Sequence, residues 1–251
     1  MRPSKHFTIR RILIAVFAVL ILTLVSARPS SAWKFTSFNV NLDIRNDSKV
    51  VVTETITADF REWPHHGIYR NIPFMVRGAG GKSYRLHIRF MGVTDQDGNP
   101  VQTEVFYKLS KMHIHIGDPE TLLEDIRTYV IRYEVSQAIN YFPEYDELYW
   151  NVTGNDWEVP IDNASCNVTL PSDSPQGLMI NAYTGSYGSK TDSVFGDTPD
   201  LHTANFWMIR ALKPGEGLAV VVAWPKGMIA KPSFAQNLES FARENGILLF
   251  P

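Results

Sequence analysis

Hydrophobic and polar residues alternate along most of the chain between Trp33 and Trp224. The first clear example is an apolar residue at every second position, namely Phe38, Val40, Leu42 and Ile44. After the turn-forming NDSK at 46–49, the run VVTETITADF repeats the alternation. A period of two is typical of a strand with one buried face. We therefore predict a β-hairpin over residues 38–60.

The same pattern predicts more strands further along. TDQDGNP lies between two alternating runs, 84–93 and 101–109, and predicts a second hairpin that turns at Asp97-Gly98. Further short strands are predicted at 112–116, 127–135, 147–152, 165–170, 177–183, 206–212 and 218–224. The last of these is apolar on both faces and is expected to be a central strand. The Gly-, Ser- and Asp-rich stretch 185–200 is predicted to be a long surface loop.

No sustained helical period occurs between Trp33 and Trp224, so helices that would cover a parallel sheet are absent from the pattern. The expected fold is therefore all-β, an immunoglobulin-like antiparallel β-sandwich. A short amphipathic helix is expected after Pro232, with Ser233 as its cap and Phe234, Leu238 and Phe241 on one face.

The first 32 residues differ from the rest. Four basic residues precede an apolar run at 12–22, and small residues follow at Ala27 and Ala32. This order is typical of an export signal cleaved after either alanine, with Ala32 preferred, and an uncleaved signal anchor is the alternative. The predicted domains are thus residues 1–32 as signal peptide or signal anchor, 33–230 as the extracytoplasmic β-sandwich, and 231–251 as the short helix and the start of a truncated membrane segment.

Charge and cysteine content restrict the partners that the protein can bind and exclude an intramolecular disulfide. Residues 1–32 hold five of the 24 basic residues and none of the 26 acidic ones, which leaves 19 basic residues and a formal charge of −7 for the remainder. Nucleic acid and anionic lipid both require a basic surface, so neither is expected as a partner. Cys166 is the only cysteine, so no intramolecular disulfide can form. It is expected to pack as a small buried hydrophobic residue; a reactive thiol or an intermolecular disulfide is the alternative.

Several motifs together resemble the YciQ-like bacterial membrane proteins, whose N-terminal extracytoplasmic domain has no known function. The motifs are TETITADF with GIYRNIP (67–73), the IGD turn (116–118) with TYVIRYEV, ELYWNVTGNDWEVPI with the Leu170-Pro171 pair, and AWPKG (223–227). The resemblance implies an exported β-domain followed by a membrane segment. It implies no catalytic or ligand-binding residue, because none is established for that family.

Two groups of residues invite a metal or calcium interpretation. His113 and His115 lie two positions apart on a predicted strand, so their imidazoles would share a face. No acidic residue or cysteine completes this pair, or the pair His65-His66, at a familiar spacing, so a structural role is preferred. The acidic residues of TDQDGNP suit a hairpin turn better than a calcium loop.

Aromatic and acidic residues between Tyr141 and Trp157 suggest either ligand binding or core packing. Tyr149, Trp150 and Trp157 could stack on a glycan or a peptide, and core packing is the preferred role of the two tryptophans. The carboxylates Glu144, Asp146, Glu147, Asp156 and Glu158 could be imagined as a glycosidase pair, but sequence spacing cannot place two of them across a sugar.

Tyr69 and Arg70 are the remaining binding candidates, on a proline-bounded segment expected to be a loop. Arg70 could present a planar donor beside an aromatic face, or it could pair with an internal acid such as Glu54. The sequence contains no GxSxG, P-loop or HExxH motif. We therefore expect a non-enzymatic interaction module without a cofactor, exported across the cytoplasmic membrane, with a membrane or cell-envelope protein as partner. A glycan-binding or glycan-processing module and a histidine-based metal-binding protein are the alternatives.

Overall fold

The structure is a computed structural model that describes residues 33–77, 83–189 and 193–232. The chain divides into two units, Met1–Ala32 and Trp33–Pro251, and the described residues all belong to the second. These residues form strands and connecting turns without a helix, so the all-β prediction is confirmed. No helix suited in length and hydropathy to crossing a bilayer is found within the described ranges. The predicted signal sequence and the helix after Pro232 lie outside these residues.

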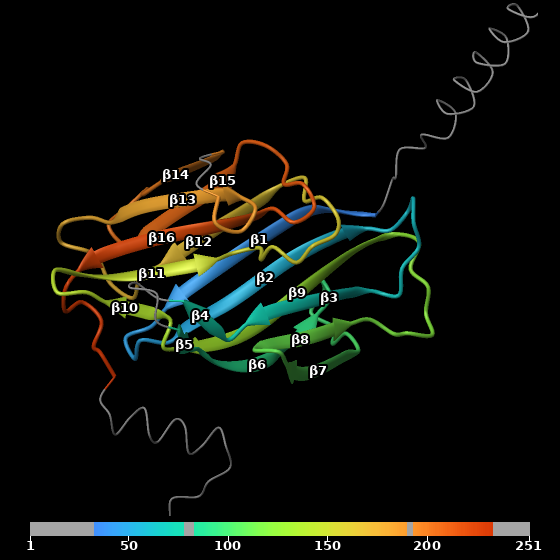
Figure 1. The fold of residues 1–251 in the computed structure, drawn as a ribbon, viewed down its shortest axis with the longest axis horizontal. Coiled ribbons are helices and arrows are strands. Elements are labelled where there is room, and N and C mark those ends of the chain that lie inside the picture. The colour runs from blue at the N-terminus through green and yellow to red at the C-terminus, as the bar shows by residue number, and fades with distance from the viewer. Residues whose placement is uncertain (1–32, 78–82, 190–192, 233–251) are drawn as a thin grey trace, which may run out of the picture. The chain divides into compact units, whose positions relative to one another are not determined.

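The largest sheet has seven strands (Figure 1). Its order is β14 (Val194–Asp197), β15 (Thr203–Met208), β12 (Ala164–Thr169), β1 (Lys34–Ile44), β2 (Val50–Asp59), β9 (Ile126–Ser136) and β6 (His87–Thr94). Strands β1 and β2 form the predicted first hairpin, with Ile44 opposite Val50. The pair β1–β12 is parallel, with Phe38 opposite Ala164. The sheet is therefore mixed, and the expectation of a wholly antiparallel fold is wrong at this pair.

Two smaller sheets have four and three strands. The four-stranded sheet has the order β10 (Ile139–Tyr141), β11 (Tyr145–Asn151), β16 (Gly217–Pro225) and β13 (Met179–Gly185). The three-stranded sheet has the order β3 (Ile68–Pro73), β8 (Lys111–Ile116) and β7 (Thr103–Lys108). A further short hairpin pairs β4 (Met75–Arg77) with β5 (Ser83–Arg85). Strand β16, apolar on both faces, lies between β11 and β13, as predicted for a central strand.

Both smaller sheets cover the same face of the seven-stranded sheet, and the hydrophobic core lies between the two layers. Inward-facing residues of the seven-stranded sheet include Phe38, Ile56 and Ile131, which join a single buried cluster with residues of both small sheets. From the four-stranded sheet come Leu148, Trp150, Val220, Val222 and Trp224, and from the three-stranded sheet Ile68, Ile72, Met112, Ile114 and Ile116. Period-two alternation in each strand directs these side chains into the core.

The strand count and the strand order do not show an immunoglobulin-like domain. Such a domain has about seven to nine strands in two sheets, whereas the described residues form 16 strands in four sheets. Strand β14 lies inside the stretch 185–200 that was predicted to be a loop, where Phe195 pairs with Trp207. Its four residues amid Gly, Ser and Asp gave too short a pattern to recognise.

The second predicted hairpin is also wrong in its pairing. The turn at Asp95–Asn99 forms, and the Asp95 carboxylate accepts hydrogen bonds from the backbone of Asp97 and Asn99 at 2.9 Å each. Beyond the turn only a single bridge joins Thr94 to Pro100. The two backbone hydrogen bonds that flank this bridge, from Asp95 N–H to the Asn99 oxygen and from Val101 N–H to the Val93 oxygen, are not continued into a ladder. Strand β6 therefore pairs with β9, and β7 pairs with β8.

Candidate functional site

The segment 67–73, expected to be a loop, forms strand β3, and Arg70 points from it into the core. Arg70 is 3% exposed and lies between the inward-facing Ile68 and Ile72. Its Nε and Nη2 atoms each donate to the carboxylate of Glu54 on β2 at 2.8 Å. The hydroxyl of Tyr133 on β9 donates to the same carboxylate at 2.6 Å. Both groups of the ion pair are thus enclosed and hydrogen-bonded.

The remaining donors of Arg70 hold the segment that follows β11. Its Nη1 donates to the carbonyl oxygen of Thr153 at 2.8 Å and its Nη2 to that of Val152 at 3.2 Å. The indole Nε1 of Trp157 donates to the same Thr153 oxygen at 2.8 Å. The guanidinium carbon also lies 5.4 Å from the centre of the Phe38 ring and 5.9 Å from that of Trp157. Arg70 therefore connects all three larger sheets from inside.

The surroundings raise the pKa of two groups in this cluster, Arg70 and Tyr133. Burial alone would lower the pKa of Arg70, but the charge of Glu54 and the hydrogen bonds to it outweigh burial and raise that pKa. Burial, followed by the charge of Glu54, raises the pKa of Tyr133 well above its ordinary value. The guanidinium stays protonated and Tyr133 stays a donor. A group whose donors are all directed at internal oxygens serves as a structural connector, which is the second of the two roles that the sequence left open for Arg70.

Two glycines from different motifs, Gly67 and Gly117, contact each other. Gly67 has φ +136° and Gly117 has φ +127°. A Cβ on Gly67 would lie 1.9 Å from the carbonyl oxygen of Ile116, and one on Gly117 would lie 2.1 Å from that of His66. No other residue type fits this contact of two backbones. The motifs GIYRNIP and IGD therefore meet where β3 begins and β8 ends.

Lys226 of the motif AWPKG contacts Asp146, the residue just before the motif ELYWNVTGNDWEVPI. Lys226 Nζ lies 2.7 Å from the Asp146 carboxylate, whose residue is 1% exposed, and also donates to the Phe142 carbonyl oxygen at 2.7 Å. Glu147, the next residue on β11, is half-buried on the opposite face of the strand. Burial raises the pKa of Glu147. The carboxylates of Asp146 and Glu147 therefore lie on opposite faces of β11. Asp156 forms an ion pair with Lys111, whose Nζ lies 2.5 Å from the carboxylate.

Tyr69 lies on the outer face of the three-stranded sheet, one position from the buried Arg70. It is 59% exposed, and its ring stacks face to face on His115 with the centroids 4.2 Å apart. Phe106, 41% exposed, stacks in the same way on His113 at 4.9 Å. The amide oxygen of Asn71 lies 2.8 Å from Nδ1 of His113. We call Tyr69, Asn71, Phe106, His113 and His115 the aromatic–histidine face.

The two histidines share a face of β8, as their spacing predicted. Each is paired with an aromatic ring across the sheet. Among the described residues, no group of three or more His, Cys, Asp or Glu side chains is arranged to hold a metal ion. His65 packs against the Trp33 ring at 5.0 Å, and burial lowers its pKa.

Tyr149 lies on the outer face of the four-stranded sheet and is 52% exposed. Val221 and Asn181 are its neighbours across the sheet. The Asn181 amide donates to the hydroxyl of Tyr183 at 2.9 Å. Burial, followed by the proximity of the Tyr187 and Tyr183 phenols, raises the pKa of Tyr149. Tyrosine and amide side chains therefore share this face.

Trp150 and Trp157 point into the core, with exposures of 6% and 8%. Trp157 packs edge-on against Phe35 at 4.6 Å. The indole nitrogens of Trp150 and Trp224 are buried without a hydrogen-bond partner among the described residues. Of the five proposed binding residues, only Tyr69 and Tyr149 present their side chains to solvent. Cys166 is buried, as predicted, and burial raises its pKa.

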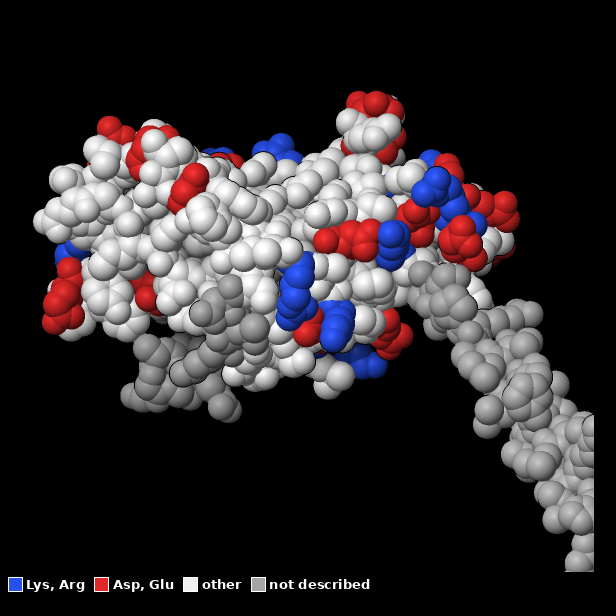
Figure 2. Space-filling view, turned by 90° about the horizontal axis from the view of Figure 1, so that it is seen from above, with Lys and Arg blue, Asp and Glu red and all other residues white. Residues whose placement is uncertain are grey.

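The distribution of charge gives no extended basic surface on the face shown in Figure 2. Charged side chains gather mainly toward one end of that face, where acidic and basic groups lie side by side, and much of the rest is uncharged.

The chain is similar in sequence to a known protein. It is 25% identical to the uncharacterized protein YciQ of Escherichia coli K12 over 226 residues, which cover 85% of this chain and 33% of that protein. The chain thus spans about a third of the length of this relative.

Similarity to solved structures is weaker. Yeast LTA4 hydrolase in complex with bestatin matches 79% of the chain with 10% identity and a TM-score of 0.47, and the match covers 32% of that protein. An M1 zinc metallopeptidase from Deinococcus radiodurans matches 76% of the chain with 12% identity and a TM-score of 0.43, and the match covers 42% of that protein. At this level neither likeness bears on function. The family model described as "Predicted membrane protein (DUF2207) N-terminal domain" matches residues 34–224. The chain therefore belongs to this family, and residues 34–224 are the N-terminal domain of a predicted membrane protein of unknown function.

Proposed function

We propose that this domain is a non-catalytic, extracytoplasmic interaction module that binds a protein partner in the membrane or cell envelope. The observation that carries the proposal is the aromatic–histidine face, where Tyr69 and Phe106 are exposed and each is stacked on a histidine. Exposed tyrosine and phenylalanine are enriched at protein interfaces, where they provide a large contact area.

The buried cluster beneath this face supports the proposal. Arg70 anchors the same strand that presents Tyr69, with two donors on Glu54. The ring stacked on His115 loses little rotamer freedom when a partner binds, because it is already held. A rigid support below and a fixed aromatic surface above are the features of a prearranged recognition site.

A non-catalytic role is supported by the carboxylates of β11. Asp146 is bound by Lys226 on one face of the strand, while Glu147 lies on the other. Two carboxylates on opposite faces of a strand cannot flank one glycosidic bond. Hydrolysis of a cell-wall or peptide substrate by the purified protein, lost in Glu147→Gln or Asp156→Asn, would overturn this part of the proposal.

Site-specific photocrosslinking tests whether a partner protein binds to the aromatic–histidine face. A benzophenone amino acid is placed at position 69 or 106 of the full chain in its own cells, and a matched control carries it at the exposed position 149. We expect a discrete crosslinked protein from positions 69 and 106 and none from 149. Crosslinks from 149 alone would assign binding to the four-stranded sheet and overturn the proposed face.

Glycan binding is a second candidate function, and it is favoured by the outer face of the four-stranded sheet. Tyr149, Asn181 and Tyr183 combine aromatic rings with an amide and carry no charge. Aromatic rings stack on the C–H faces of sugars, and amides bond to their hydroxyls. Calorimetric titration with glycan fragments tests this candidate, and the absence of binding below about 1 mM (roughly −4 kcal/mol) would reject it.

A further inference from the structure

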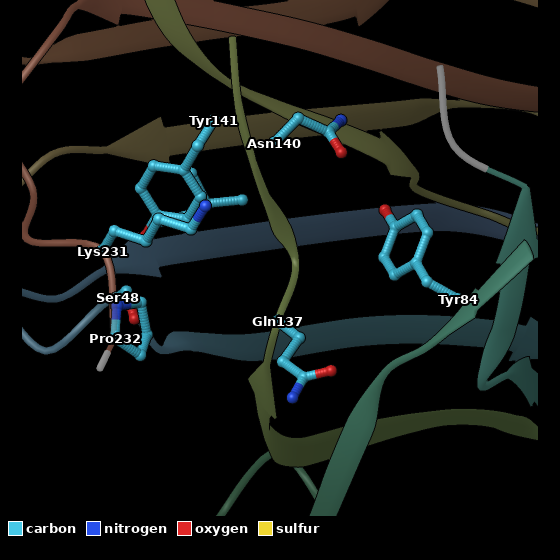
Figure 3. A pocket seen from close by; sticks show the side chains of 8 residues that line it. Ser48, Tyr84, Gln137, Asn140, Tyr141, Lys231 and Pro232 are labelled. Carbon is cyan, nitrogen blue, oxygen red and sulfur yellow. The ribbon is translucent and has the colours of Figure 1, made fainter. Parts of the chain in front are cut away.

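A pocket lies where the chain passes from the seven-stranded sheet into the four-stranded one. Its volume is about 260 Å³, and it is lined by Ser48, Tyr84, Gln137, Ile139, Asn140, Tyr141, Lys231 and Pro232. In Figure 3, Tyr84 stands on one side of it, Tyr141 and Lys231 stand on the other, and Gln137 and Asn140 come from the segment between. Gln137 has φ +65°, and this left-handed residue turns the chain from β9 toward β10.

The lining consists mainly of uncharged hydrogen-bonding groups and aromatic rings. Gln137 and Asn140 provide amides, and the Asn140 amide is oriented by Glu147 at 3.5 Å. Burial, followed by the charge of Glu147, raises the pKa of Tyr84, so its hydroxyl stays protonated and can donate. Planar amides and phenols in a small open pocket are suited to a ligand with many hydroxyl groups.

One end of the pocket is positively charged. Lys226 and Lys231 both approach the Tyr141 ring, with Nζ 5.3 Å and 5.6 Å from its centroid. Lys226 is neutralised by Asp146 at 2.7 Å. Lys231 forms no ion pair with another residue of the described part of the chain, and it is exposed. The opposite end is negative, since Glu147 lies behind Asn140.

We propose that this pocket binds a saccharide that bears a carboxylate. The carboxylate would meet Lys231 beside Tyr141, and the sugar hydroxyls would meet Gln137, Asn140 and Tyr84. The opposite arrangement would bring the carboxylate close to Glu147 and is disfavoured by repulsion. This proposal does not depend on the aromatic–histidine face. Tyr149 does not line the pocket, although Glu147 behind Asn140 lies on the same face of β11 as Tyr149.

Two disaccharides that differ by a single acidic group test the proposal. The probes are the disaccharide of N-acetylglucosamine and N-acetylmuramic acid, which carries a lactyl carboxylate, and neutral diacetylchitobiose. Calorimetry on the full chain in detergent is expected to show about tenfold tighter binding of the acidic disaccharide, as for one charge-assisted hydrogen bond. Lys231→Met should remove this preference and leave the weaker binding of chitobiose unchanged.

Two control variants separate the possible sites. Lys108→Met makes the same charge change on β7 and should preserve the preference, and Tyr149→Ala should also preserve it. Loss of binding in Tyr149→Ala with normal binding in Lys231→Met would assign the saccharide to the outer sheet face and overturn the pocket. Binding of neither disaccharide, or tighter binding of a glutamate pentapeptide than of either, would overturn the ligand class.

Discussion

Arg70 and Glu54 form a two-pronged ion pair in the core, with Nε and Nη2 each 2.8 Å from a carboxylate oxygen. The pair joins β3 to β2, and Arg70 reaches on to the chain that follows β11. Four of the motifs on which the sequence resemblance rests therefore meet at one cluster, namely those containing Glu54, Arg70, Tyr133 and Thr153. Together these motifs form a buried cluster that links the three larger sheets to one another.

Removal of one partner of this pair is expected to be costly. Arg70→Met leaves the Glu54 carboxylate buried without its counter-charge and should lower the free energy of unfolding by about 3–5 kcal/mol in urea titrations. The double variant Arg70→Met with Glu54→Leu should recover much of that loss, because no unpaired charge remains. The control is Lys34→Met, which breaks the exposed pair with Asp162 and should cost less than about 1 kcal/mol. A cost for Arg70→Met as small as that of the control would contradict the role of the cluster.

The contact between Gly67 and Gly117 predicts that alanine at either position lowers stability far more than alanine at Gly98. Gly67→Ala and Gly117→Ala should each destabilise the domain by more than about 3 kcal/mol, because the added methyl group would overlap a backbone carbonyl. Gly98 also has a positive φ, +86°, but has open space around its Cβ position. Gly98→Ala should cost only about 1–2 kcal/mol, for the conformation alone. Thermal unfolding of the three variants measures this order, and equal losses would refute the close contact.

Cys166 is expected to resist thiol reagents in the folded protein. It is 2% exposed, and burial raises its pKa, so little thiolate is present or accessible at pH 8. Labelling with a chromogenic disulfide should be slow in buffer and complete in concentrated urea. Rapid labelling of the folded chain would show that β12 opens readily.

The lowered pKa of Asp59 predicts that the domain loses stability in acid. Its hydrogen bond from Arg61, opposed by partial burial, lowers its pKa from 3.8 to about 2. Because the folded pKa lies below the unfolded one, the contribution is full above pH 4 and disappears as the pH falls toward 2. Asp59→Asn should therefore make stability less dependent on pH between 4 and 2, as measured by urea unfolding at each pH. An unchanged slope would indicate that the pair is absent in solution.

Local patterns predicted most of the strands, but the pairing of distant segments could not be predicted. The hairpin of β1 and β2 follows from alternation on both sides of one turn. The parallel partner of β1, strand β12, lies more than a hundred residues further along, and nothing in either pattern selects it. A loop was predicted at 67–73 because the segment is bounded by proline, and the charged Arg70 at an inward position hides the alternation of the strand. Its partner Glu54 could be named only as one option, and the contribution of Tyr133 and Thr153 was missed, because hydrogen bonding across sheets leaves no periodic signal.

The parallel pair of β1 and β12 also determines the order in which the domain can assemble. Strands β1, β2, β9 and β6 can pair as soon as the chain has been made as far as Ser136. Until Ala164–Thr169 arrives, the other side of β1 is an open edge at what becomes the middle of the sheet. Unpaired edges recruit strands from other molecules. An emerging chain therefore passes through an aggregation-prone half-sheet, and fragments that end before Ala164 should associate, whereas chains that include β12 close the edge themselves.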